Sequence, residues 1–172
     1  MKNLNWIEST GGPLILLHRE LLPHWSGIKK SLFDADTTDY SRACDVHDEL
    51  GVVAVGPKQA LVLGDEPDAT AIIQNENSIF IVRWRWAPSE NELLSTLHDA
   101  LNSLEFCDSG SFSTTLGTHL LFDSSIAGTE VDESLIVELG AARFSLANAY
   151  FQPKKDICAL IHRLEGPTTS IG

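Results

Sequence analysis

The sequence has few cysteines and no long apolar run. Its three cysteines, Cys44, Cys107 and Cys158, are an odd number at wide spacing, which does not fit a framework of disulfide bonds. Reduced thiols are typical of a cytoplasm, so we expect a cytoplasmic protein. The longest apolar run near the N-terminus covers residues 14–17, which is too short for a signal-peptide core or a membrane span. We therefore expect the protein to stay in the compartment where it is made.

Positive charge is also scarce. The chain has 12 Lys and Arg against 24 Asp and Glu, which gives a net charge of −12 and a pI near 4.7. Residues 86–142 include ten acids and neither Lys nor Arg. A field of this sign repels nucleic acid and anionic lipid and attracts basic proteins. The negative charge predicts a basic protein partner and argues against binding to nucleic acid or a membrane. The alternative is that the charge serves only to keep the protein soluble.

The chain is long enough to bury a hydrophobic core without disulfide or metal staples. It has 172 residues, 43% apolar and 21% charged, as is usual for a globular protein. We find no internal repeat, no low-complexity segment and no sharp change in composition. These observations predict one domain over residues 1–165 and a flexible C-terminal tail over residues 166–172.

Apolar alternation and turn residues predict a fold that is mostly strands. Gly56-Pro57 and the polar residues 75–78 each separate two apolar runs, which is typical of hairpins. In the run 79–86 the alternation places Arg83 and Arg85 on the face opposite Trp84 and Trp86. The expected strands cover residues 13–17, 51–55, 60–63, 69–74, 79–86, 116–122, 135–139, 144–151 and 157–164.

One helix is clear in the sequence, over about residues 89–104. Ser89 and Glu92 have the spacing of a capping box, and leucines recur at helical spacing, so this helix should pack on a sheet. A short second helix is expected at residues 40–45. Strands before and after one good helix, joined by short loops, favour an α+β fold with an antiparallel-rich sheet.

The segment Cys44-Asp45-Val46-His47-Asp48-Glu49 is the densest cluster of chemically active side chains. Sulfur, imidazole and carboxylates together can bind zinc, and a small metal-dependent hydrolase built on this cluster is one interpretation. However, no second Cys or His pair occurs at ligand spacing. The acids around Cys44 also disfavour the thiolate that a nucleophile needs. We therefore expect no metal, no cofactor and no catalytic residue.

Other polar side chains have structural explanations. His119 and His162 lie in apolar strands, where a lone histidine usually has a hydrogen-bond partner and a packing role. Arg83 and Arg85, beside Trp84 and Trp86, could clamp single-stranded nucleic acid. In a chain of net charge −12, we expect instead that these arginines balance neighbouring acids.

Four motifs in the N-terminal third occur in a fixed order. The first is Trp6-Ile7-Glu8-Ser9-Thr10-Gly11-Gly12-Pro13, and the second is Trp25-Ser26-Gly27. The third is Asp39-Tyr40-Ser41-Arg42-Ala43-Cys44, and the fourth is Leu63-Gly64-Asp65-Glu66-Pro67. In this order they resemble the immunity protein 21 family of bacterial polymorphic-toxin systems. The resemblance covers about residues 6–67, and the later strands are similar only in layout.

This resemblance implies a bacterial cytoplasmic antidote that binds and blocks a cognate toxin domain, with no catalysis and no cofactor. A structural or adaptor domain without a toxin remains an alternative, as does the hydrolase. The acids that we expect to meet the partner lie in loops and turns: Asp39, Asp45, Asp48, Glu49, Asp65, Glu66 and Asp68. The motif residues that we expect to serve mainly the fold are Trp6, Gly11, Gly12, Pro13, Trp25, Gly27, Tyr40, Cys44, Gly64 and Pro67.

Three local expectations can be compared directly with a structure. Gly11 and Gly12 should adopt backbone angles closed to other residues, with a positive φ at Gly12, and Pro13 should fix the entry to the first strand. Trp6, Trp25 and Tyr40 should pack together beneath this turn, with the indole N–H groups bonded to backbone. Cys44, one helical turn after Tyr40, should face the same interior.

Overall fold

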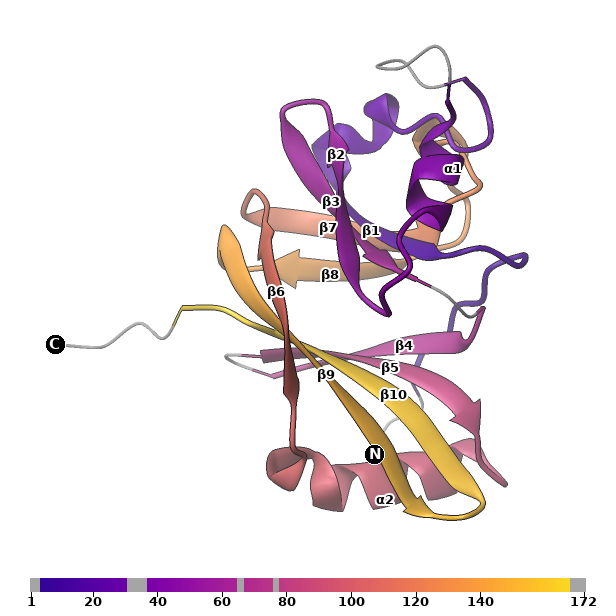
Figure 1. Ribbon diagram of the computed structural model, residues 1–172, viewed down its shortest axis with the longest axis vertical. Helices are drawn as coiled ribbons and strands as arrows, with labels where there is room; N and C mark the ends of the chain where they lie inside the picture. The colour runs from indigo at the N-terminus through magenta and orange to yellow at the C-terminus, as the bar shows by residue number, and fades with distance from the viewer. Residues whose placement is uncertain (1–3, 31–36, 65–66, 76–77, 168–172) are drawn as a thin grey trace, which may run out of the picture.

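The protein is built from two five-stranded antiparallel sheets stacked face to face, with helical segments on both outer faces (Figure 1). The structure is a computed structural model and describes residues 4–30, 37–64, 67–75 and 78–167. From top to bottom in Figure 1, the four layers are short helices, the first sheet, the second sheet and one long helix. The α+β class with antiparallel sheets that the sequence predicts is confirmed.

The first sheet has the strand order β2-β3-β1-β7-β8. Its central strand β1, Leu14–His18, is completely buried and pairs with β3 on one side and β7 on the other. The hairpin at Gly56-Pro57 joins β2 to β3 as predicted, and Gly56 has the positive φ of 57° that this turn requires. The other strands are β2 Gly51–Val55, β3 Lys58–Leu63, β7 Gly117–Asp123 and β8 Leu135–Leu139.

The second sheet has the order β4-β5-β10-β9-β6. Its longest strand, β9, forms a hairpin with β10 that has a register shift near Ala159. Its edge strand β6 contacts β3, the neighbour of the edge strand β2, and its other edge strand, β4, contacts the edge strand β8 of the first sheet. One side of the molecule therefore has edges β2 and β6, and the other has β4 and β8. The strands are β4 Ala69–Gln74, β5 Ser78–Trp86, β6 Cys107–Ser113, β9 Arg143–Lys154 and β10 Ile157–Glu165.

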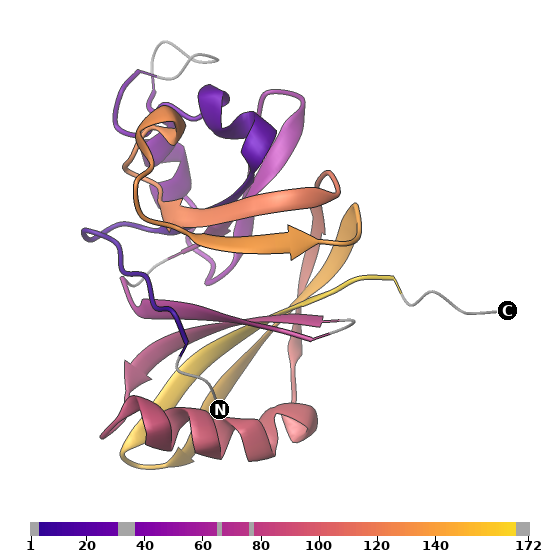
Figure 2. The same cartoon turned by 180° about the vertical axis from the view of Figure 1, so that it is seen from behind.

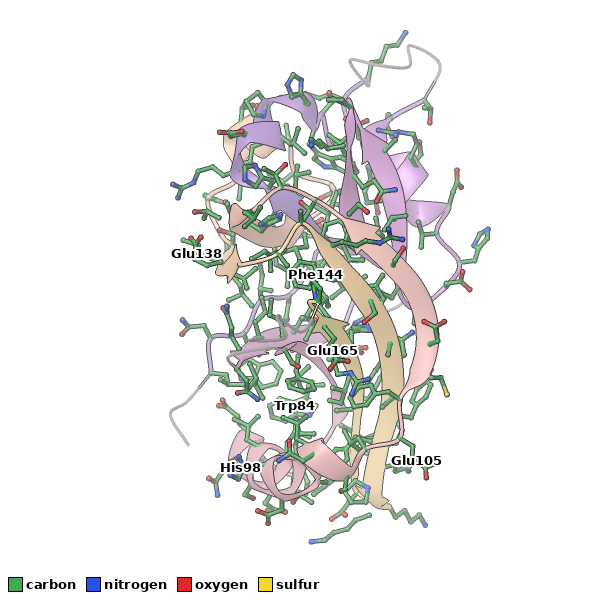
Figure 3. The ribbon with its side chains drawn as sticks, turned by 90° about the vertical axis from the view of Figure 1, so that its left-hand side faces the viewer. Trp84, His98, Glu105, Glu138, Phe144 and Glu165 are labelled. Atoms are coloured by element: carbon green, nitrogen blue, oxygen red, sulfur yellow. The ribbon has the colours of Figure 1, made fainter. Side chains whose placement is uncertain are left out.

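Three apolar clusters fill the spaces between the four layers. The central cluster joins the two sheets, and Phe144 lies in it between them (Figure 3). A second cluster covers the outer face of the first sheet and includes Trp25. A third lies between the second sheet and the long helix, where Trp84 packs at the border (Figure 3). Both faces of both sheets are thus covered, which explains why central strands such as β1 are apolar on both sides.

The helices begin where their caps predict. Helix α2, Glu90–Ala100, starts after Ser89, whose Oγ accepts the Glu92 N–H at 3.2 Å, and continues as the 3-10 helix η2, Leu101–Ser103. Helix α1, Asp39–Cys44, confirms the expected second helix and has a capping box between Thr38 and Ser41. The remaining 3-10 helices are η1, Arg19–His24, and η3, Gly128–Glu130.

The sequence prediction and the structure differ at β6, which we did not expect. Its residues include three serines and a glycine, and only Phe112 is buried, so the strand has no alternating apolar pattern. Its pairing with β9 places it at the edge of the second sheet. Most of the predicted tail lies at residues 168–172, outside the described residues. Among the described residues, no helix has the length and apolar character needed to cross a lipid bilayer.

Candidate partner-binding surface

The loop between α1 and β2 brings part of the predicted acidic set to one place. Gly64, at the end of β3, donates its N–H to the Glu49 carbonyl at 3.2 Å. A Cβ at Gly64 would lie 2.3 Å from the Asp48 carbonyl oxygen, so only glycine allows this close approach. Asp45 and Asp48 are exposed, and Glu49 is half-buried. The loop 45–49 is therefore held beside the segment that leads from β3 to β4.

An exposed aromatic side chain from the second sheet joins this loop. Tyr150 on β9 is 63% exposed, and its hydroxyl contacts the Glu49 carboxylate. We call Asp45, Asp48, Glu49 and Tyr150 the acidic surface. The sequence analysis missed Tyr150, because it considered acids alone and because alternation places Tyr150 on the same face of β9 as the buried Phe144 and Leu146.

The polar contacts continue inward from the acidic surface. Asn148 donates its Nδ2 hydrogen to Glu49 at 3.5 Å, and its Oδ1 pairs with Nδ1 of His162 at 2.6 Å. Burial, with the nearby charges of Arg83 and Arg85, lowers the pKa of His162 to about 3. His162 is thus neutral, and its hydrogen bond helps to hold Asn148 in place beneath the acidic surface.

The prediction that Asp39 is an exposed acid is wrong. Asp39 is completely buried, although it stands at the start of α1. Its carboxylate accepts the Ser26 N–H at 2.6 Å and pairs with the Arg42 guanidinium at 2.5 Å. Both partners, together with the helix N-terminus, favour a buried negative charge there. Asp39 therefore fastens α1 to the segment after Trp25 and does not belong to the acidic surface.

Asp68 is also largely withdrawn from solvent. Its carboxylate lies 3.0 Å from Arg85 and 3.8 Å from Arg83, and its side chain is 14% exposed. Arg83 is almost fully buried and donates to the Gly64 carbonyl at 2.7 Å. The expectation that these arginines balance neighbouring acids is confirmed. Asp65 and Glu66, the other predicted acids of this segment, lie outside the described residues.

Several glycines and tryptophans of the four motifs lie where two segments of the chain pack closely against each other. Gly12 lacks a positive φ, contrary to our expectation. A glycine is needed there for another reason, because a Cβ at Gly12 would lie 2.5 Å from the Tyr40 ring. Gly11 has φ 130° and Gly27 φ 59°, and a Cβ at Gly27 would meet the Ser125 carbonyl at 2.4 Å.

Trp25 is buried as expected, and its indole N–H donates to the Ser124 carbonyl at 2.9 Å.

The expected packing of Trp6 with Trp25 is wrong. Trp6 packs edge-on against Trp84, with ring centroids 5.4 Å apart, in the cluster beside α2. Its N–H donates to the Glu90 carboxylate at 2.9 Å and not to backbone. The motif set therefore serves two separate cores, one on each outer face of the stacked sheets.

The remaining motif residues lie at turns and ends of strands. Pro13 is buried, and its carbonyl accepts both the N–H and the hydroxyl of Ser124. Pro67 is exposed. Cys44 is exposed, contrary to the prediction of an inward thiol. A hydrogen bond with Cys44 raises the pKa of Tyr40.

The described residues offer no obvious metal centre. Among them, no group of three or more His, Cys, Asp or Glu side chains converges as a metal ion requires. His119 is buried, hydrogen-bonded through Nε2 to Thr114 at 2.7 Å, and burial lowers its pKa to about 4. His119 thus has the satisfied structural setting that we expected, and Cys44 and His47 are both exposed.

Comparison with known proteins extends the resemblance beyond the N-terminal third. A family model described as immunity protein 21 matches residues 5–157 of the chain. The matched span runs from the segment before Ile7 to the first residue of β10, and so covers the whole first sheet and the second sheet except for the rest of β10. Neither the curated proteins nor the solved structures gave a match.

Proposed function

Because the chain belongs to the immunity protein 21 family, we propose that it binds and neutralises the cognate toxin domain of a bacterial polymorphic-toxin system. It acts by covering the toxin and not by catalysis, in the cytoplasm of the cell that makes both proteins. The observation that carries this proposal is the family match over residues 5–157.

The acidic surface is the part of the molecule that we assign to the toxin. It combines exposed carboxylates with one exposed aromatic ring, and such a mixture suits a protein interface: charge guides the encounter and a tyrosine anchors the complex. The loop that bears it is held by Gly64 and by the Glu49–Tyr150 contact, so little order has to be gained on binding. Asp65 and Glu66 extend the same acidic set along the sequence.

The proposed toxin surface is basic. A toxin that acts on nucleic acid needs a positive groove for its substrate, and an acidic inhibitor can fill that groove. The chain's net charge of −12 supplies a field that attracts such a surface. Complementary fields raise association rates to about 10⁸–10⁹ M⁻¹s⁻¹ at low salt, against about 10⁵–10⁶ without steering.

Stopped-flow association with the toxin domain encoded beside this gene tests the surface. The rate should fall steeply as salt rises, because screening shortens the reach of the field to about 10 Å at 0.1 M. The double variant Asp45→Asn with Asp48→Asn should associate more slowly than the wild type. The control, Asp99→Asn with Glu105→Gln, removes two exposed acids near α2 and should change the rate less. Equal effects of both pairs would refute the assignment to the acidic surface while leaving toxin binding intact.

A further inference from the structure

A groove runs between the edges of the two sheets on the side opposite the acidic surface. It has a volume of about 510 Å³ and is lined by Leu4, Asn5, Ile72, Gln74 and residues 134–136. Figure 2 shows its two walls, β8 and β4, with the N-terminal segment beside β4. Among the described residues, no strand pairs with the outer edge of β8.

The outer edge of β8 presents backbone groups to this groove. The Glu138 carbonyl accepts the Gln74 Nε2 hydrogen at 2.9 Å, so the backbone of Glu138 points away from β7. In an antiparallel strand, alternate residues direct their N–H and C=O to the same side. The N–H and C=O of Ile136 therefore also point away from β7 and toward the groove, whereas Val137 faces His119 of β7.

The opposite wall of the groove, β4, already pairs along its outer edge with another segment of the chain. Ile7 and Thr70 exchange both backbone hydrogen bonds, at 2.9 and 2.8 Å, as an isolated antiparallel bridge. The N-terminal segment thus already pairs with the outer edge of β4. At β8 the Gln74 side chain reaches across the equivalent edge to Glu138, and no strand within the described ranges pairs with that edge. Unpaired edges of this kind are templates for an added strand.

The groove also indicates the chemistry of an added strand. On its inner side, Leu135 and Ile72 pack against the central apolar cluster. On its outer side, Asp132, Glu133 and Glu138 are exposed, and Figure 3 shows Glu138 projecting at the rim of the first sheet. No Lys or Arg occurs from residue 86 to residue 142. A strand with apolar side chains on one face and basic side chains on the other fits both sides.

We propose that this groove docks an extended basic segment of a partner protein, which pairs with β8 at Ile136 and adds a strand to the first sheet. The site stands apart from the proposed toxin contact, because β8 is at the opposite edge of the sheet from β2. A second copy of this chain is a poor occupant, since two β8 edges would bring the same acids together.

A synthetic eight-residue peptide of alternating lysine and valine is a suitable probe. Its titration into the full chain, followed by NMR, should shift resonances of β8 and slow amide exchange at Ile136 and Glu138. A control peptide of alternating lysine and proline has the same charge but lacks half of the N–H donors, and it should not protect these amides. Protection of the two amides by the lysine–valine peptide alone supports the proposal.

Two variants separate backbone pairing from charge. Ile136→Pro removes the outward N–H and keeps the pairing with β7, so it should weaken the lysine–valine peptide by about tenfold or more. Ile136→Thr keeps the N–H and should bind within about threefold of the wild type. Equal binding by Ile136→Pro and Ile136→Thr would overturn the proposal. Shifts confined to Asp45–Glu49, or a dimer of the free chain that Ile136→Pro dissolves, would also overturn it.

Discussion

Glu49 and Tyr150 lie 101 positions apart in the chain, and the carboxylate of one contacts the hydroxyl of the other. Glu49 ends the loop before β2 in the first sheet, whereas Tyr150 projects from β9 in the second. Their contact joins the two sheets at the surface that we assign to the toxin. Tyr150 is nevertheless 63% exposed, so most of its ring is available to a partner.

Replacement of Tyr150 by alanine should weaken the toxin complex by about 2 kcal/mol or more, because anchoring tyrosines at interface centres have effects of this size. Thermal stability should change little, since the ring is mostly exposed. Tyr150→Phe, which keeps the ring, should retain most of the affinity. Calorimetric titration and thermal melts give the two quantities. A stable Tyr150→Ala variant with full affinity would place the interface elsewhere.

Gly64→Ala should destabilise the fold by about 1–3 kcal/mol, because the new methyl group would meet backbone that cannot move aside easily. The group in its way is the Asp48 carbonyl oxygen, 2.3 Å from the position of the Cβ. Gly140→Ala is the matched control, since a Cβ there has nothing within 4 Å. Urea unfolding of both variants measures the difference, and equal losses would contradict the close packing of the loop 45–49.

Stability should decrease as the pH falls from about 6.5 toward 3. The folded pKa of His162 is lowered to about 3, first by burial and then by Arg83 and Arg85, whereas an unfolded histidine titrates near 6.5. Between these values the unfolded chain binds more protons, so the contribution of neutral His162 is full above about pH 6.5 and is lost as the pH falls. His119 acts in the same direction.

Urea unfolding between pH 7.5 and 4.5 measures this dependence. His162→Gln removes the titrating group, so its free energy of unfolding should vary less with pH over this range than that of the wild type. Gln can still pair with Asn148, which limits the loss of packing and hydrogen bonding. Identical pH profiles for the two proteins would show that His162 is not neutral in the folded state.

Periodicity and turn residues predicted most of the fold. The strand ranges 51–55, 69–74 and 135–139 agree with β2, β4 and β8, because each combines apolar or β-branched residues with clear turn signals. Helix α2 was predictable from Ser89 and its leucine spacing. The strand β6 was not, since its serines and glycine carry no periodic signal and its position depends on β9.

The candidate site was less predictable, because exposure depends on partners far away in the sequence. Asp39 and Asp68 occur in polar segments typical of loops, yet Arg42 and Arg85 hold them inside the structure. Arg83 lies in a strand pattern that suggests an exposed face, but the second sheet is covered on both sides. Tyr150 became part of the acidic surface only through the stacking of the two sheets.

Neutralisation of the toxin inside a cell tests the central claim most directly. The toxin domain encoded beside this gene is expressed from an inducible promoter in bacteria, with and without this chain, and growth is measured. We predict that the wild-type chain restores growth. The variant Asp45→Asn with Asp48→Asn and Tyr150→Ala should restore it poorly at equal protein level, because the acidic surface carries the contact. Growth arrest despite abundant, folded wild-type chain would contradict the proposed function.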